Sequence, residues 1–290
     1  MSFFEGSEKK IEFGVKSNVK LRSFDRSYWV DLVAKARAQI LSEISSDACT
    51  AYLLSESSLF VWDDRMLLIT CGTTTLSEAA HFFIDKVGED NIDFMIFERK
   101  NEYMPHLQHT DFYEDVSALR KRIKGRAFRF GKPDEHHLFL FHSTQKYQPD
   151  PNDCTIEILM YDLQGPARDV FTGKPCVDIR KITNVDAIFP GFKVDDFSFS
   201  PCGYSLNALR GSDYYTIHVT PQEQGSYVSF ESNVNLDENI TNSVCRVLEI
   251  FRPKMFDVAI FKPDQHFDLD IPGFSVRKRV RQTLQNGYKV

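Results

Sequence analysis

The chain has 290 residues, of which 42% are hydrophobic and 26% are charged. A chain of this composition can bury a sizeable core, which excludes a disordered protein. Lys and Arg number 35 against 41 Asp and Glu, a net charge of −6 that argues against general nucleic-acid binding, because such binding needs a basic surface.

Apolar spacing along the chain predicts helices separated by many short strands. Side chains from Trp29 to Ile44 recur at helical spacing and predict an amphipathic helix over about 28–45, and a shorter helix is expected after Gly72. Two further helices are predicted at 112–123 and 240–251. Short β-branched and aromatic runs predict strands at 51–54, 58–62, 65–70, 92–98, 137–142, 155–161, 203–209, 213–219, 226–231 and 256–261.

Runs of adjacent strands outnumber the helices in this order of elements. That pattern is unlike a doubly wound βαβα fold and favours an α+β fold, in which helices cover mostly antiparallel sheets. The candidate linkers at 148–152 and 164–166 are short enough to be loops. We therefore expect a single domain over residues 1–290.

The N-terminus and the cysteines bear on the compartment. The first ten residues carry charges where a secretory signal needs an apolar run, and no stretch approaches the roughly 18 apolar residues of a membrane helix. Six cysteines are scattered without a CxxC pair, which fits a reducing cytoplasm. His136 and His137 are adjacent, so in a strand they point to opposite faces, and no metal site is expected.

Polar islands interrupt several of the apolar runs. Ser55-Glu56-Ser57-Ser58 lies inside a strand-like stretch, and on its own it is typical of a turn between two strands. Cys71 lies at the end of a predicted strand, in a turn of small residues. Ser205 and His218 lie on two predicted neighbouring strands. A nucleophilic hydroxyl, a thiol and an imidazole are groups that catalysis uses.

Together these segments resemble the eukaryotic-type S-adenosylmethionine decarboxylase proenzymes, a pyruvoyl-dependent family of polyamine synthesis. The resemblance runs in order through FFEGSEK at 3–9, LSESS at 54–58, TCGTT at 70–74, RKN at 99–101, TIEILM at 155–160, PCGYS at 201–205, YTIHVTP at 215–221 and SYVSFE at 226–231. It implies a four-layer α/β/β/α sandwich with two antiparallel sheets. It also implies self-cleavage between Glu56 and Ser57, giving a small chain 1–56 and a large chain 57–290 that begins with a pyruvoyl group derived from Ser57.

The resemblance assigns a role to each polar group. The Ser57 hydroxyl attacks the preceding carbonyl, Ser205 stabilises the oxyanion, and His218 removes the Cα proton of residue 57, work that suits an imidazole near neutral pH. After decarboxylation, Cys71 protonates the substrate carbon, and Glu8 lies beside the reacting group. A free cysteine is more commonly a small buried hydrophobe, so this role for Cys71 rests on the motif alone.

The same resemblance implies how S-adenosylmethionine is bound. The adenine stacks between Phe4 and Phe199, and Leu54 and Glu56 contact its edge. The family has a glutamate that binds the ribose hydroxyls where this chain has Gln222. An amide can accept one hydrogen bond and donate another, but it lacks the charge of a carboxylate.

Some family members are activated by putrescine in a buried acidic pocket. The residues that match this pocket are Glu12, Asp153, Thr155, Glu157, Glu231 and Phe261, with Arg99 as a compensating cation. Ile69 stands where a lysine is expected, which predicts a more negative pocket. Such a pocket either needs a polyamine more firmly or keeps some of its acids protonated.

The expected function is thus decarboxylation of S-adenosylmethionine to the aminopropyl donor of spermidine synthesis. One alternative is a pyruvoyl-dependent decarboxylase of another amino acid, such as ornithine or arginine, which Gln222 alone favours. The other is a non-catalytic regulatory paralogue, although Ser57, Cys71, Ser205 and His218 are all retained. We expect no nucleic-acid or membrane partner, and a homodimer is among the options for the oligomeric state.

Overall fold

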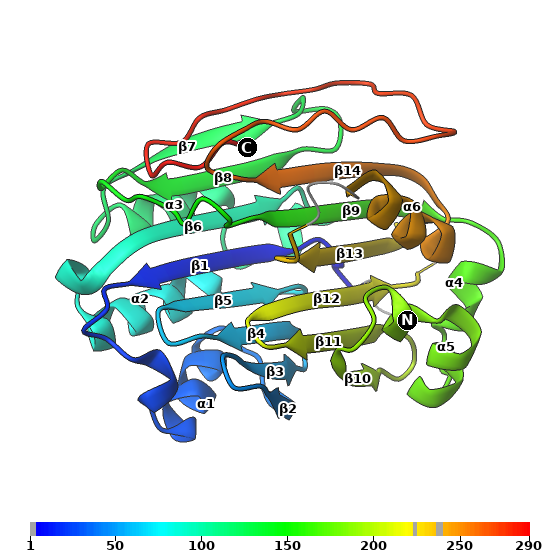
Figure 1. The fold of residues 1–290 in the computed structure, drawn as a ribbon, viewed down its shortest axis with the longest axis horizontal. Helices are drawn as coiled ribbons and strands as arrows, with labels where there is room; N and C mark the ends of the chain where they lie inside the picture. Colours follow the sequence, from blue (N-terminus) through cyan, green and yellow to red (C-terminus); the bar gives the residue numbers. More distant parts are fainter. Residues whose placement is uncertain (1–3, 223–224, 236–239) are drawn as a thin grey trace. The chain divides into compact units, whose positions relative to one another are not determined.

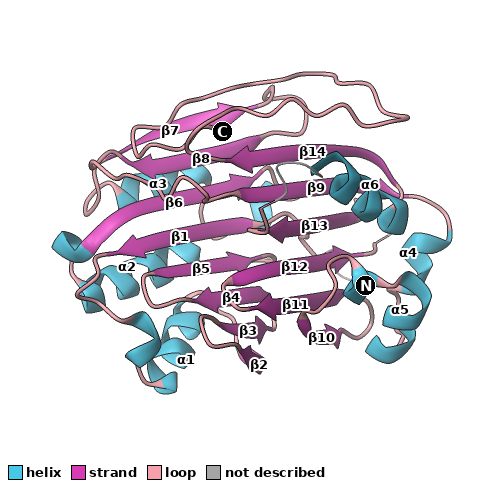
Figure 2. Cartoon of the chain, in the orientation of Figure 1, coloured by secondary structure: helices cyan, strands magenta, loops and turns pink. Residues whose placement is uncertain are grey.

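The structure, a computed structural model, describes residues 4–222, 225–235 and 240–290. Contacts divide the chain into two compact units, unit 1 (residues 1–148 and 284–287) and unit 2 (residues 149–283 and 288–290). Each unit contains one antiparallel sheet and its own helices (Figure 1, Figure 2). The predicted α+β class with two antiparallel sheets is confirmed, whereas the single-domain assignment stays a prediction.

Unit 1 is built on an eight-stranded sheet with the order β2-β3-β4-β5-β1-β6-β8-β7, in which all neighbours are antiparallel. Its strands are β1 (Lys9–Val15), β2 (Ile40–Ser45), β3 (Thr50–Leu54), β4 (Ser57–Val61), β5 (Arg65–Thr70), β6 (Ile92–Lys100), β7 (Gly125–Phe130) and β8 (Leu138–Ser143). Its helices are α1 (Arg26–Lys35), α2 (Leu76–Val87) and α3 (Phe112–Leu119), with short 3-10 turns at Leu21–Ser23, Glu89–Asn91 and Pro105–Leu107.

The helices of unit 1 cover one face of its sheet. Alternate residues of the central strands point to that face, so Phe13 of β1 and Leu68 of β5 pack with Trp29 of α1 and Phe83 of α2 in one buried cluster. The rings of Phe13 and Phe83 stack with centroids 4.7 Å apart. This packing fixes which face each strand residue occupies, including the polar residues at the strand ends.

A capping box starts α3 and fixes the end of the loop before it. The Asp111 carboxylate accepts a hydrogen bond from the Glu114 amide at 2.8 Å, and the Glu114 carboxylate accepts one from the Asp111 amide at 2.9 Å. Such a reciprocal pair satisfies two amides that the first helical turn leaves without partners. The loop 101–111 therefore ends at a defined position.

Unit 2 is built on a six-stranded antiparallel sheet with the order β10-β11-β12-β13-β9-β14. Its strands are β9 (Thr155–Leu163), β10 (Lys193–Ser198), β11 (Tyr204–Arg210), β12 (Asp213–Thr220), β13 (Tyr227–Ser232) and β14 (Pro253–Phe261). Its helices are α4 (Pro166–Val170), α5 (Cys176–Thr183) and α6 (Ile240–Phe251), with a 3-10 turn at Val185–Ala187.

The two faces of the six-stranded sheet differ in polarity. Ile217 and Phe230 pair across β12 and β13 on the face that packs with the helices in a buried apolar cluster. Because strand residues alternate, the opposite face carries Ser205, His218 and Ser229 in one row across β11, β12 and β13. All three of these polar residues are buried.

The helix predicted over 28–45 is wrong in its second half. The helix α1 ends at Lys35, Arg37 has a positive φ of 62°, and β2 follows at Ile40–Ser45. Ile40 and Ile44 are four residues apart, a spacing that fits a helix face but also the alternation of a strand. Residues 40–45 form a strand because they pair with β3 in the antiparallel sheet.

The other predicted elements agree with the structure to within a few residues. Helices occur after Gly72, at Phe112–Leu119 and at Ile240–Phe251, and each predicted strand corresponds to one of β3–β6, β8, β9 or β11–β14. The strands β1, β2, β7 and β10 and the helices α4 and α5 were not predicted. Of these, β1 matters for function because it lies in the middle of its sheet, between β5 and β6.

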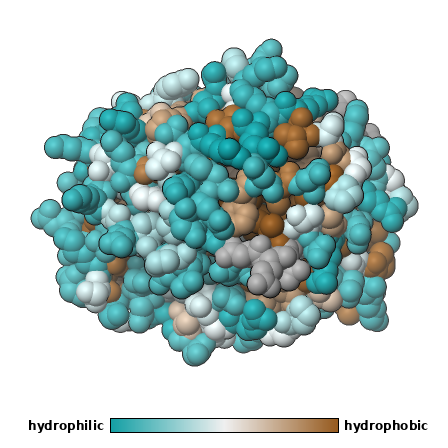
Figure 3. Space-filling model, turned by 45° about the horizontal axis from the view of Figure 1, so that its top comes forward, coloured by the Kyte–Doolittle hydropathy of each residue, from teal (hydrophilic) through white to brown (hydrophobic). Residues whose placement is uncertain are grey.

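The face of the molecule drawn in Figure 3 is largely hydrophilic. Figure 3 shows one face of the molecule covered mostly by hydrophilic side chains, with a smaller gathered area of apolar ones. Among the described residues, no helix is both long enough and apolar enough to cross a membrane.

Candidate active site

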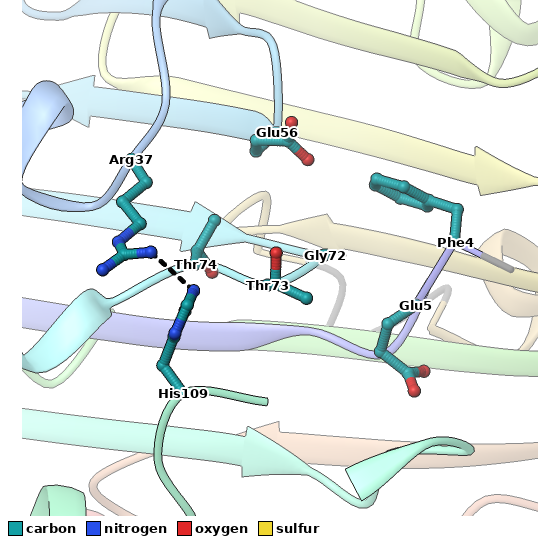
Figure 4. Close-up of a pocket in the computed structure, with 8 residues that line it drawn as sticks. All are labelled: Phe4, Glu5, Arg37, Glu56, Gly72, Thr73, Thr74 and His109. Atoms are coloured by element: carbon teal, nitrogen blue, oxygen red, sulfur yellow. Dashed lines mark hydrogen bonds between the residues drawn. The ribbon is translucent and has the colours of Figure 1, made fainter. Parts of the chain in front are cut away.

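A pocket of about 210 Å³ opens in unit 1 (Figure 4). Its lining residues come from separate segments of the chain and are Phe4, Glu5, Arg37, Glu56, Gly72, Thr73, Thr74 and His109. Figure 4 shows Phe4 and Glu56 on one side and the hydrogen-bonded pair of Arg37 and His109 on the other. Two residues expected to bind substrate, Phe4 and Glu56, therefore line one pocket.

The turn between β3 and β4 contains the expected cleavage site. Ser57 is the first residue of β4 and stands directly opposite Thr70, the last residue of β5. Ser57 is buried and has a φ of 124°. Residues other than glycine avoid positive φ because the Cβ atom clashes with the backbone. The backbone is therefore strained at the residue whose peptide bond is expected to break.

Cys71 follows β5 and contacts both residues of that bond. The Ser57 Oγ atom lies 3.4 Å from Cys71 Sγ, at hydrogen-bonding distance. The Glu56 carbonyl oxygen accepts a hydrogen bond from the Cys71 amide at 3.0 Å and lies 3.6 Å from Cys71 Sγ. Donors in this position can stabilise the negative charge that develops on a carbonyl oxygen under attack.

Burial sets the protonation of the acidic groups at this site. Burial, followed by the Glu56 carboxylate, raises the pKa of Cys71, so its sulfur carries a proton at neutral pH. Burial also raises the pKa of Glu56 from 4.5 to about 7, with Lys9 acting in the opposite direction. The Glu56 Oε2 atom is buried and has no hydrogen-bond partner among the described residues, so it can contact a ligand.

The segment before β1 holds Phe4 against the turn that follows Cys71. The Glu5 carbonyl accepts a hydrogen bond from the Gly72 amide at 2.7 Å, and the Glu5 carboxylate accepts one from the Met104 amide at 2.9 Å. Gly72 has a φ of 68°, and a Cβ atom there would lie 2.9 Å from Glu56 Oε2 and 3.2 Å from the Phe4 ring. Only glycine therefore fits this close approach.

The serine and histidine expected to assist cleavage lie in unit 2. Ser205 on β11 stands directly opposite His218 on β12, and both are buried. The His218 Nδ1 atom lies 3.3 Å from Ser229 Oγ, and its Nε2 atom lies 3.2 Å from Thr216 Oγ1. Contacts on both ring nitrogens fix the orientation of the imidazole, as a proton-transfer residue requires.

The remaining substrate residues are divided between the units. In unit 1, Leu54 ends β3 and is buried in the core, and the Glu8 carbonyl accepts a hydrogen bond from the Lys100 amide at 2.8 Å. In unit 2, Phe199 follows β10, where its ring meets that of Phe197 edge-on at 4.9 Å. Gln222 lies two residues after the end of β12 and is half-buried.

The expected pairing of Arg99 with the acidic pocket needs a correction. Because strand residues alternate, Arg99 lies with Lys9 on one face of the sheet, and Glu12 lies on the other. The Arg99 guanidinium is buried and pairs with Glu102 and Asp115, both at 2.6 Å. The cation beside Glu12 is instead Arg65, 3.1 Å away.

The predicted consequence of Ile69 also changes. Lys10 stands directly opposite Ile69 across β1 and β5, so it lies on the same face of the sheet. The Lys10 ammonium forms a buried ion pair with Glu98 at 2.9 Å. This face therefore keeps a lysine, supplied by the neighbouring strand rather than by position 69.

The other residues of the expected putrescine pocket lie in unit 2 on neighbouring strands. Glu157 and Glu231 are buried and stand directly opposite each other across β9 and β13. Like charges in such a pair repel, and the Tyr214 hydroxyl donates a hydrogen bond to Glu231 that offsets part of this cost.

Thr155, the first residue of β9, stands opposite Phe261, the last residue of β14. Asp153, two residues before Thr155, accepts a hydrogen bond from the Tyr288 hydroxyl. Both remaining polar residues of the expected pocket therefore lie at the same end of the sheet.

Comparison with known proteins identifies the family of the chain. The family model described as adenosylmethionine decarboxylase matches residues 1–290. The chain belongs to the adenosylmethionine decarboxylase family. It is 32% identical to the S-adenosylmethionine decarboxylase proenzyme of Dictyostelium discoideum, over 99% of this chain and 84% of the relative. It is 36% identical to the proenzyme of Trypanosoma cruzi, over 89% of this chain and 75% of the relative.

Two further matches agree with that assignment. The Drosophila melanogaster proenzyme is 36% identical over 89% of this chain and 82% of the relative. The crystal structure of a Trypanosoma brucei AdoMetDC monomer matches with a TM-score of 0.62 and 28% identity, over 80% of this chain and 95% of that chain. The resemblance to adenosylmethionine decarboxylases and the predicted enzyme class are confirmed. None of these matches favours a decarboxylase of a free amino acid or a non-catalytic paralogue.

Sequence reasoning missed several residues that line or contact the pocket of unit 1. Arg37 and His109 form one wall, with Arg37 Nη1 2.6 Å from His109 Nε2. Lys9 contacts two of the residues that line the pocket, Gly72 and Thr74. Lys9 belongs to the FFEGSEK motif, which is the one signal that could have singled it out.

Proposed function

We propose that this chain is a proenzyme that cuts itself between Glu56 and Ser57 and then decarboxylates S-adenosylmethionine with a pyruvoyl group derived from Ser57. The observation that carries the proposal is the convergence of three groups at a strained backbone. The Cys71 Sγ atom lies 3.4 Å from the Ser57 Oγ atom and 3.6 Å from the Glu56 carbonyl oxygen, and Ser57 has a φ of 124°.

Cleavage begins with attack of the Ser57 hydroxyl on the Glu56 carbonyl carbon, which turns the peptide into an ester and frees the Ser57 amine. The Cys71 amide, 3.0 Å from the Glu56 oxygen, stabilises the oxyanion, and the resemblance adds Ser205 to this step. In the step that the resemblance assigns to His218, the imidazole removes the Cα proton of residue 57, and the ester breaks to leave residue 56 with a new C-terminal α-carboxylate. Hydrolysis releases the nitrogen as ammonia and leaves the pyruvoyl group.

The residues around Ser57 fit that group. The pyruvoyl group supplies an electrophilic ketone and an electron sink for the decarboxylation. Cys71, protonated in its buried setting and 3.4 Å from Ser57 Oγ, gives its proton to the substrate carbon after CO₂ leaves. Glu8, which also raises the pKa of Cys71, is assigned a place beside the reacting group.

The pocket supports an adenosyl substrate. Phe4 offers an aromatic face to the base and to the sulfonium cation, and the buried Oε2 atom of Glu56 can accept a hydrogen bond from the adenine amine. The resemblance adds Leu54 at the edge of the base, Phe199 on its other face and Gln222 at the ribose. These assignments are proposals for the substrate-bound enzyme.

We further propose that a diamine such as putrescine activates the enzyme, and that the residues which the resemblance assigns to it bind it: Glu12 of unit 1 and Asp153, Thr155, Glu157, Glu231 and Phe261 of unit 2. The buried pair of Glu157 and Glu231 supports this, because two adjacent carboxylates favour a cation. Putrescine should stimulate CO₂ release by the wild type and not by Glu231→Gln.

The compartment and the oligomeric state complete the proposal. We assign the enzyme to the cytoplasm, because all six of its cysteines are free. A homodimer is an outcome that analytical ultracentrifugation can measure directly.

An intact-mass spectrum of the purified protein tests the central proposal. The wild type should consist of a chain of residues 1–56 and a chain beginning with a pyruvoyl group at position 57, and it should release CO₂ from S-adenosylmethionine. Ser57→Ala should remain one uncut, inactive chain. A wild type that stays a single chain without a ketone-reactive group would overturn the proposal. Faster CO₂ release from ornithine or arginine would contradict the substrate.

A further inference from the structure

Lys9 is a buried lysine for which the mechanism above has no role. It is the first residue of β1 and stands opposite Thr70 of β5 and Arg99 of β6. The residue is 1% exposed. Burying an ammonium group is costly, so a lysine in this position needs a compensating set of contacts.

The contacts of Lys9 join the cysteine turn to the loop on the other side of the pocket. Its Nζ atom donates hydrogen bonds to the Gly72 carbonyl at 2.9 Å and to Gln108 Oε1 at 2.7 Å, and it lies 3.5 Å from Thr74 Oγ1. Gly72 follows Cys71 directly. The ammonium has three protons, and these three oxygens match them.

All three of these partners are neutral. Among the residues that the structure describes, no carboxylate lies within ion-pairing distance of Lys9 Nζ, and the nearby charges are those of Arg99, Glu102 and Asp115. Arg99 is itself paired with both of these acids. Burial and then the charge of Arg99 lower the pKa of Lys9 from 10.5 to about 8, so its charged form is mostly retained at neutral pH.

On the other side, the positive charge of Lys9 acts on the acids at the cleavage site. Besides burial, which has the largest effect, four groups influence the Cys71 thiol. Glu56 and Glu8 oppose its ionisation, whereas the hydrogen bond from Ser57 and, with the smallest effect, the charge of Lys9 favour it. Lys9 is the one cation among these groups. The same ammonium also favours the ionised form of Glu56.

From this geometry we infer that Lys9 is a positioning residue with an electrostatic role: it holds the turn that carries Cys71 and stabilises the thiolate formed when Cys71 has given its proton to the substrate. The inference rests on the proposed function. In that step the S–H bond of Cys71 breaks, a C–H bond forms on the substrate carbon, and the charge stays on sulfur until water returns a proton. Lys9 stays protonated throughout.

The test separates the charge of Lys9 from its hydrogen bonds. Lys9→Gln can still donate to the Gly72 carbonyl but has no charge, Lys9→Met lacks both, and Lys9→Arg keeps the charge. Gln108→Leu is the matched control, because it removes one partner of Lys9 and leaves the ammonium in place. The probe is methyl methanethiosulfonate, whose rate of reaction with Cys71 is followed against pH, with Cys71→Ala as the background.

In the wild type the reaction rate should rise steadily with pH below the raised pKa of Cys71, because only the thiolate reacts. In Lys9→Gln that rise should move to higher pH by about one unit, which at a fixed pH on the slope is a tenfold slower reaction. Decarboxylation should slow by a similar factor, and the large chain should more often end turnover with alanine at position 57. Lys9→Arg should restore most of both rates, and Gln108→Leu should leave the pH of the rise unchanged.

If the reaction rate of Cys71 depends on pH in Lys9→Gln as it does in the wild type, the inference is overturned. It is also overturned if Gln108→Leu shifts this pH dependence as far as Lys9→Gln does. If Lys9→Met does not fold, the nearly isosteric Lys9→Gln still decides the question. The thiol titration needs no cleavage and can be repeated in Ser57→Ala. Lys9→Gln could thus shift the thiol titration in the Ser57→Ala background while the wild type stays uncut. That pair of results would refute the proposed function and keep the coupling between Lys9 and Cys71.

Discussion

The backbone strain at Ser57 predicts an unusual order of stabilities in uncut protein. Ser57→Ala and Ser57→Gly both lack the attacking hydroxyl, so neither is cleaved, and both lose the same contact with Cys71. A residue with a Cβ atom at a φ of 124° pays about 1–3 kcal/mol, whereas glycine does not. Glycine loses roughly 0.4–1 kcal/mol through its more flexible unfolded chain. Glycine should therefore be the more stable variant by roughly 0.5–2 kcal/mol.

Thermal denaturation monitored by circular dichroism can measure this difference, since each kcal/mol corresponds to roughly 2–4 °C for proteins of about this size. Ser58 provides the control because it is also buried in β4 and is not among the residues with positive φ. In the uncut Ser57→Ala background, Ser58→Gly should be less stable than Ser58→Ala. If Ser57→Gly melts at or below the temperature of Ser57→Ala, the strain does not exist and the reasoning fails.

Other substitutions test separate parts of the site. Cys71→Ala should still be cleaved, because its backbone amide still binds the Glu56 carbonyl oxygen. It should decarboxylate the substrate slowly and accumulate alanine at position 57. Unchanged turnover would make Cys71 a packing residue. Gln222→Glu should lower the Michaelis constant for S-adenosylmethionine by about tenfold, and no change would remove this residue from the ribose. Phe199→Ala should raise that constant, since a stacking contact is worth roughly 1–3 kcal/mol, and an unchanged constant would argue against stacking. Because folding raises the pKa of Glu56, the folded protein binds more protons than the unfolded chain between pH 4.5 and about 7. The free energy of unfolding should therefore fall as the pH rises through that window. Urea titrations should show this dependence in the wild type and not in Glu56→Gln.

The closeness of Ser57 and Cys71 could be predicted because both residues belong to neighbouring stretches of the sequence. Ser57 and Cys71 lie on β4 and after β5, two strands joined by a short turn, and the polar islands around them marked strand ends correctly. Neighbouring strands in a hairpin pair with little freedom, so a motif on each strand places the two side chains together.

The parts that sequence reasoning missed depend on long-range pairing. The strand β1 lies between β5 and β6 although neither is next to it in sequence, so nothing local indicates that Lys9 contacts residues that line the pocket or that Lys10 faces Ile69. A shift by one residue would exchange the faces of these two lysines. The resemblance assigned Arg99 to the same pocket as Glu12, but alternation along β6 and β1 places these two residues on opposite faces of the sheet.

The positive φ of Ser57 has a further consequence if the cut occurs where we propose. That torsion exists only while the residue has a nitrogen bonded to a tetrahedral, L-configured Cα. In a pyruvoyl group the nitrogen has gone and the carbon is a planar ketone, so the stereocentre responsible for the steric clash is no longer present. The reverse reaction would have to rebuild that stereocentre in its least favourable geometry. The L-configuration that strains the precursor would thus also disfavour the reverse reaction, which makes the cleavage harder to reverse.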